Sequence, residues 1–67
     1  MTNTRQFSDT VKSVREKLGI SQEDLARELG ISFSTVNRWE NGKTTPSRLA
    51  QKSFDTFCIG MKKEGKL

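Results

Sequence analysis

The sequence predicts a small all-α domain, a compact bundle of four helices or, in the alternative arrangement, of five. Three observations predict it. A chain of 67 residues makes one small domain. Only 31% of the residues are hydrophobic, so the core must be compact and helices should dominate. Serines that can cap a helix alternate with glycines that can end one, and the apolar residues between them recur at helical spacing.

The first helix is expected from residue 5 or 6 to residue 18, because its apolar residues recur every three or four positions and so share one face. Thr4 and Ser8 are both candidate caps for its start, and Gly19 is expected to end it. Residues 1–4 are polar and are expected to be frayed.

The second helix is expected over residues 22–29 and has clear signals at both ends. Ser21 can cap it, and Asp24 can reach back to the Ser21 amide as in a capping box. Gly30 ends it in the left-handed region. Ala26 is small, as it must be if the next helix passes closely over it.

The third helix is expected over residues 33–41, with Ser32 as its cap. Because only residues 30–31 separate this cap from the second helix, the two helices must turn sharply against each other. Val36 and Trp39 are expected to face the core. The polar or exposed positions gather on the opposite face: Phe33, Ser34, Asn37, Arg38 and Asn41.

The fourth helix is expected over residues 46–62, with Thr45 as its cap and Pro46 in the first helical position. No break signal occurs before Gly60, which favours one long helix over two short ones. Residues 63–67 are basic and are expected to be frayed. One apolar stripe is predicted along the helix: Leu49, Ala50, Phe54, Phe57, Cys58 and Met61.

Composition limits the classes of function. The formal charge of +4 favours a polyanionic partner, although solubility alone would also account for it. The chain has one cysteine and no histidine, so we predict no disulfide, no metal site and no cofactor. Cys58 lies on the apolar stripe with no base nearby in sequence, and we predict no catalytic residue and no enzyme activity. No apolar run is long enough to span a membrane, and the protein is expected in the cytoplasm.

The central part of the chain resembles the helix-turn-helix of the phage repressor, Cro and Xre-like family of bacterial DNA-binding proteins. The resemblance covers roughly residues 11–46 and rests on small, glycine and apolar positions that agree together. These are Gln22, Leu25, Ala26, Leu29, Gly30, Ile31, Val36 and the closing Trp39-Glu40-Asn41-Gly42-Lys43. It implies a lambda-repressor-like DNA-binding domain over residues 1–67, with its helix-turn-helix core at about 11–46. The implied function is sequence-specific binding of double-stranded DNA by a small transcriptional regulator, a repressor.

The outer face of the third helix carries the expected base contacts. Arg38 can bind guanine with two hydrogen bonds, Asn37 can bind adenine, and Ser34 can bond to either kind of base. By resemblance, Ser32 and Phe33 join these recognition residues. Ser32 is alternatively a cap alone. Phe33 either contacts a thymine methyl group or packs on the second helix or on a partner.

Phosphate contacts are expected on both sides of these residues. The resemblance implies Gln22 at the start of the second helix, and the end of the third helix with the residues that follow it supplies the others: Asn41, Lys43, Thr44 and Arg48. Lys43 is alternatively a solvated loop lysine. The resemblance also implies a partly buried ion pair between Arg15 and Glu40, with two independent surface charges as the alternative.

Three partner interpretations remain open at this stage. The lower apolar stripe, around Phe57, Ile59 and Met61, favours a homodimer through the fourth helix, or else it simply covers the first helix and the base of the third. The chain is alternatively the DNA-binding antitoxin of a toxin–antitoxin pair, with a toxin or co-regulator as its protein partner. It is alternatively a protein-interaction module that does not bind DNA. A DNA-bound protein would be associated with the nucleoid.

Overall fold

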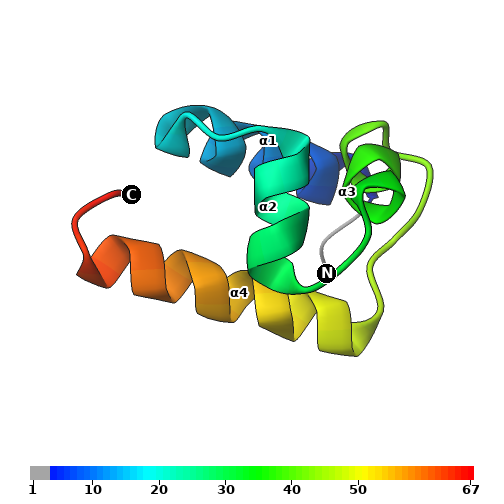
Figure 1. The fold of residues 1–67 in the computed structure, drawn as a ribbon. Coiled ribbons are helices and arrows are strands. Elements are labelled where there is room, and N and C mark those ends of the chain that lie inside the picture. Colours follow the sequence, from blue (N-terminus) through cyan, green and yellow to red (C-terminus); the bar gives the residue numbers. More distant parts are fainter. Residues whose placement is uncertain (1–3) are drawn as a thin grey trace.

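The computed structural model describes residues 4–67. Of residues 1–4, which the sequence predicts to be frayed, residues 1–3 lie outside that range, and Thr4 is instead the first residue of a helix. The described residues form four helices and no strand (Figure 1): α1 (Thr4–Leu18), α2 (Gln22–Leu29), α3 (Phe33–Glu40) and α4 (Arg48–Lys63). The prediction of an all-α, four-helix domain is confirmed. Among these residues, no helix combines the length and the apolar character that a membrane crossing needs.

One aromatic cluster joins three of the helices. In Figure 1, α1 and α4 run along two edges of the molecule, α2 crosses between them, and α3 lies beside α2. The Phe7 ring of α1 packs edge-to-face on Trp39 of α3, with centroids 5.2 Å apart, and on Phe54 of α4, at 5.5 Å. The buried apolar core draws on all four helices: Phe7, Val11, Leu25, Ala26, Val36, Trp39 and Phe54.

The ends of α2 and α3 are fixed by local hydrogen bonds. The Ser21 hydroxyl accepts from the Asp24 amide at 3.0 Å, and the Asp24 carboxylate accepts from the Ser21 amide at 3.2 Å, which completes the capping box. Gly30 has a φ of 69°, which suits glycine and lets the chain turn at once. The Ser32 hydroxyl then accepts from the Thr35 amide at 3.2 Å. These predicted caps are confirmed, and they leave the turn between α2 and α3 little freedom.

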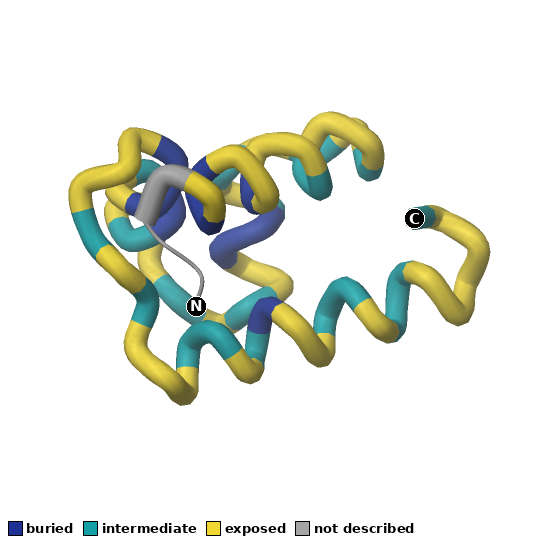
Figure 2. The backbone as a smooth tube through the Cα atoms, turned by 180° about the vertical axis from the view of Figure 1, so that it is seen from behind, coloured by how far each residue is buried: buried dark blue, intermediate teal, exposed yellow. Residues whose placement is uncertain are grey.

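The start of α4 corrects the sequence prediction. Ser47 caps the helix by accepting from the Ala50 amide at 3.2 Å, so Thr45 and Pro46 lie before it. Leu49 is 76% exposed and is not part of the packed stripe. It precedes Phe54 by five residues, which is about 140° around a helix, and so it lies away from the buried face. Phe54 is the buried residue of α4. Figure 2 shows most of this helix as intermediate or exposed.

Two other segments differ from expectation. Ser8 lies inside α1, which begins at Thr4, and its hydroxyl donates to the Glu40 carbonyl at 2.6 Å. It is buried and does not cap the helix. The segment after Lys63 folds back: the Lys66 amide donates to the Met61 carbonyl at 2.9 Å.

Candidate nucleic-acid interface

The helix α3 is fixed on one side and open on the other. Val36, Trp39 and Glu40 are buried on its inner side. The side chains of Ser34, Arg38 and Asn41 are exposed, Asn37 is half-buried between the two sides, and Phe33 is 48% exposed. We call Phe33, Ser34, Asn37, Arg38 and Asn41 the outer face. This face carries one formal positive charge, from Arg38, and no carboxylate, because Glu40 turns inward.

Glu40 is held by an ion pair with α1. Arg15 donates from Nε to Glu40 Oε2 at 2.7 Å and from Nη2 to Oε1 at 3.0 Å, so the pair is bidentate. A third donor of Arg15, Nη1, reaches the Ile20 carbonyl at 3.1 Å. Glu40 is 4% exposed, and the alternative of two independent surface charges does not describe this structure.

The pKa of Glu40 results from two opposing effects. Burial alone would raise the pKa, because it disfavours the charged form. Hydrogen bonds from Arg15 and Gln22, together with the positive charges of Arg15 and Lys12, outweigh burial, and the pKa of Glu40 lies below its ordinary value. The hydrogen bond to Glu40 correspondingly raises the pKa of Arg15. The carboxylate is therefore ionised at neutral pH, and it acts only as a hydrogen-bond acceptor.

A line of side-chain amides leads from Glu40 to the outer face. Gln22 donates from Nε2 to Glu40 Oε1 at 3.0 Å. Asn37 donates from Nδ2 to Gln22 Oε1 at 3.1 Å, and Asn41 donates from Nδ2 to Asn37 Oδ1 at 2.9 Å. We call Gln22, Asn37 and Asn41 the amide line. It connects the first residue of α2 to the middle and the end of α3.

The structure gives the expected base-contacting residues different surroundings. Arg38 and Ser34 are exposed on the outer face. Ser32 is occupied as a cap, and its hydroxyl also lies 2.8 Å from Thr35 Oγ1 and 3.2 Å from Ser34 Oγ. Phe33 is half-exposed at the start of α3. Asn37 is not wholly free, because two hydrogen bonds of the amide line hold it.

The expected phosphate contacts lie at the two ends of the motif. Gln22 begins α2 and is half-buried in the amide line. Beyond α3, Gly42 has a φ of 68°, and the Lys43 amide donates back to the Arg38 carbonyl at 3.1 Å, which fixes the backbone that carries Lys43. Lys43 is exposed, Thr44 is half-buried, and Arg48 is exposed as the first residue of α4.

Sequence reasoning missed two features of this region. Ser8 ties α1 to the end of α3, and it lines a polar hollow of about 470 Å³ with Lys12 and Asn41. Ser8 lies seven residues before Arg15. This spacing could have indicated that Ser8 faces α3 as Arg15 does, because residues two helical turns apart share a face of the helix. The amide line has a weaker signal, the four-residue spacing of Asn37 and Asn41. Within residues 4–67, no group of three His, Cys, Asp or Glu residues is placed to hold a metal ion.

A capped helix pair at a sharp turn, with the second helix anchored inside and polar outside, defines a helix-turn-helix DNA-binding domain. The chain belongs to the Xre-like helix-turn-helix family, whose model matches residues 11–49.

Curated relatives share this part of the chain. A protein of Archaeoglobus fulgidus named as an HTH-type transcriptional regulatory protein is 40% identical over 55 residues, 78% of this chain and 18% of that protein. Type II methyltransferase M1.ScrFI of Lactococcus lactis subsp. cremoris is 40% identical over 47 residues, 66% of this chain and 12% of the enzyme. HTH-type transcriptional activator BcrR of Enterococcus faecalis is 29% identical over 52 residues, 78% of this chain and 26% of BcrR. The chain thus spans about a quarter or less of these relatives. No solved structure matches it.

Proposed function

We propose that this chain binds double-stranded DNA sequence-specifically, with α3 in the major groove, as the DNA-binding part of a transcriptional regulator. The observation that carries the proposal is the outer face of α3, which offers polar donors and no carboxylate while its inner side is anchored by Val36 and Trp39. A helix of this kind fits the major groove, where each base pair presents a distinct pattern of donors and acceptors. The protein would act as a repressor by covering a promoter, in the cytoplasm and at the nucleoid.

Two of the matched relatives are named as type II methyltransferases. The chain spans only 12% of M1.ScrFI and 15% of M.SsoII of Shigella sonnei. The likeness therefore gives no reason to propose methyl transfer for this chain. It is in keeping with a DNA-binding unit that also occurs within larger proteins.

Arg38→Ala is expected to weaken binding to the preferred duplex by about 1–3 kcal/mol and to relax specificity at one base pair. The reason is that Arg38 carries the guanidinium of the outer face and can bond twice to guanine. The site is first selected from random duplex DNA, and binding is then measured by fluorescence anisotropy on single-base-pair variants of it.

Arg27→Ala is the matched control, because Arg27 is an exposed arginine of α2 that pairs only weakly with Asp24, at 3.4 Å. It should leave the base preference unchanged. If the chain binds every duplex weakly and Arg38→Ala changes nothing, the protein is better described as a protein-interaction module.

Lys43→Ala is expected to weaken binding to all sequences alike and to reduce the slope of log K against log salt by about one unit. Lys43 follows the fixed turn after α3 and is exposed, which suits a phosphate contact. Titrations at several salt concentrations measure this slope. Lys17→Ala, at the exposed end of α1, is the control and should keep the wild-type slope. A base-specific effect of Lys43→Ala would contradict the assignment.

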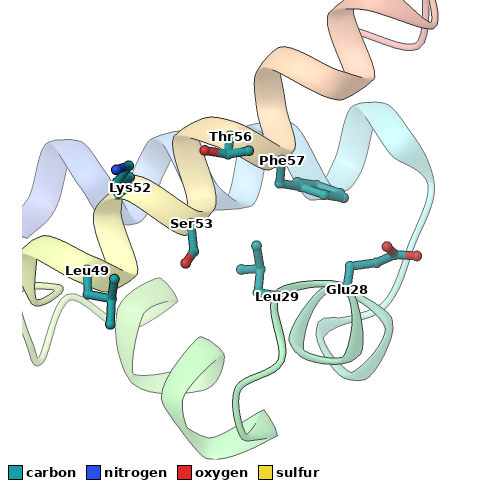
Figure 3. Close-up of a pocket in the computed structure, with 7 residues that line it drawn as sticks. All are labelled: Glu28, Leu29, Leu49, Lys52, Ser53, Thr56 and Phe57. Carbon is teal, nitrogen blue, oxygen red and sulfur yellow. The ribbon is translucent and has the colours of Figure 1, made fainter.

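We also propose a homodimer formed when a second copy docks on the groove between the end of α2 and α4 (Figure 3). Leu29 and Phe57 line this groove, of about 470 Å³, together with the exposed Leu49. Glu28 lies on its α2 side and Lys52 on its α4 side. A two-fold contact can place each Glu28 against the partner's Lys52, because the groove carries one charge of each sign. Dimers of such domains bind half-sites about one helical turn of DNA apart.

Lys52→Glu is expected to shift the protein toward monomer, because it places two like charges together, and Glu28→Lys combined with Lys52→Glu is expected to restore the dimer. Sedimentation equilibrium with and without the selected duplex measures both. Lys12→Glu, on α1, is the control for net charge and should not change the association. Wild-type protein that stays monomeric at high concentration, with and without DNA, would end the dimer proposal.

A further inference from the structure

The hydrogen bonds of the amide line can run in only one donor-to-acceptor direction, and the buried carboxylate of Glu40 determines that direction. A carboxylate has no proton to donate, so Glu40 requires Gln22 to present its NH₂ group. Gln22 then has its carbonyl oxygen left for Asn37, which must donate in turn. The carbonyl oxygen of Asn37 is therefore directed at Asn41, which donates to it at 2.9 Å. Reversing any of these amides would place two donors or two acceptors against each other.

The hydrogen bonds leave Asn37 with a defined remaining capacity. A side-chain amide has two N–H donors and two acceptor lone pairs, and the amide line uses one of each on Asn37. Asn37 therefore keeps one N–H donor on the side of Gln22 and one acceptor lone pair on the side of Asn41 for a contact with a base. Adenine offers the complement in the major groove, an N7 acceptor beside an N6 donor. The order of donor and acceptor along α3 therefore decides which way round an A·T pair can be bound.

We infer that buried Glu40, acting through Gln22, fixes the orientation of the Asn37 amide and thereby makes the protein distinguish A·T from T·A at the base pair that Asn37 contacts. Glu40 and Gln22 are positioning residues in this scheme, and Asn37 is the residue that contacts the base. The inference rests on the proposed function, since it concerns how the same outer face selects its site.

The first step of the test locates the base pair. Each position of the selected duplex is changed to the other three pairs, and binding of the wild type and of Asn37→Ala is compared. The pair whose preference disappears in Asn37→Ala is the one that Asn37 contacts. There the wild type should prefer A·T to T·A by about 5- to 100-fold, the range for one bidentate base contact.

The second step removes the hydrogen bond that fixes the orientation of the Asn37 amide. Gln22→Met keeps the Arg15–Glu40 pair but breaks the amide line, so the Asn37 amide can rotate. The A·T over T·A preference should fall to about twofold, while both remain preferred to G·C. Gln51→Met is the matched control, because Gln51 donates to the carboxylate of Asp55 at 3.0 Å on exposed α4, in the same chemistry away from the interface. It should keep the wild-type preference.

The outcomes separate the inference from the proposed function. A uniform loss of affinity in Gln22→Met, with the A·T over T·A preference intact, would show Gln22 to be a phosphate contact only and would overturn the inference. A wild type without any base preference would overturn the proposed function itself. Glu40→Gln combined with Arg15→Met is a second variant, because a carboxamide at position 40 can donate or accept. It should lose the orientation preference as Gln22→Met does, and retention of that preference would also overturn the inference.

Discussion

Replacing Trp39 with alanine is expected to lower the free energy of unfolding by about 3–5 kcal/mol, the usual cost of removing a buried aromatic side chain. Trp39 is 2% exposed, and its ring meets Phe7 edge-to-face. A domain of this size has roughly 3–10 kcal/mol of stability in total. The variant should therefore be partly or wholly unfolded, and it should lose DNA binding because α3 is no longer anchored. Urea denaturation followed by circular dichroism measures the loss, since the variant has no tryptophan to observe.

Phe33→Ala is the control on the same helix. Phe33 is 48% exposed, so its removal should cost less than about 1 kcal/mol of unfolding free energy while leaving the fold intact. In the wild type, Trp39 should emit as a buried indole, shifted to short wavelength. Equal destabilisation by the two variants, or solvent-like emission from Trp39, would contradict the division of α3 into an inner side and an outer face.

Local signals were sufficient to predict α2 and α3. Ser21, Asp24, Gly30 and Ser32 act through hydrogen bonds or backbone angles within a few residues, and such interactions can be recognised from spacing alone. The inner side of α3 could be predicted for a similar reason. Val36 and Trp39 are the apolar positions of a short helix, and their burial follows from its period.

The start of α4 could not be predicted in the same way. Both Thr45, which precedes the proline, and Ser47 are acceptable caps by residue type. Which of them caps the helix depends on the path of the loop before it, and in the structure the cap is Ser47. Leu49 shows the consequence, because an apolar residue in the first turn was expected to pack and instead lies 76% exposed. The period of the apolar residues identifies which residues share a face of a helix. It does not show how far along that helix the neighbouring helices extend.

The amide line shows a second limit of sequence reasoning. Gln22 and Asn37 are 15 positions apart, and either amide can donate or accept, so spacing and residue type leave both the partner and the direction open. Only the arrangement of α2 across α3, together with the buried carboxylate of Glu40, selects one pattern. Asn37 was accordingly expected to be free, whereas the structure holds it half-buried.

Arg15→Met is expected to destabilise the protein by about 3–5 kcal/mol, because it leaves Glu40 buried without its guanidinium. Methionine retains much of the length of the side chain, so the lost pairing dominates the loss of packing. Chemical denaturation at pH 7 measures the effect. Arg27→Met is the control: its pair with Asp24 is exposed, and pairs of that kind contribute about 0–1 kcal/mol. Equal effects of the two substitutions would show that the Arg15–Glu40 pair has no special role.

The dependence of this difference on pH provides a second test. The pKa of Glu40 is lowered in the folded protein from its ordinary value of 4.5, so its contribution to stability is present above that pH and is lost as the pH falls through the folded pKa. In Arg15→Met, burial is no longer outweighed by the guanidinium, and the pKa of Glu40 should rise. On acidification the variant gains stability as the pH falls from its raised folded pKa toward 4.5, and the wild type loses stability below 4.5. The stability difference between them should therefore begin to shrink above pH 4.5 and continue to shrink below it. A difference that stays constant from pH 7 to pH 3.5 would mean that the cost of Arg15→Met arises from packing and not from the stranded carboxylate.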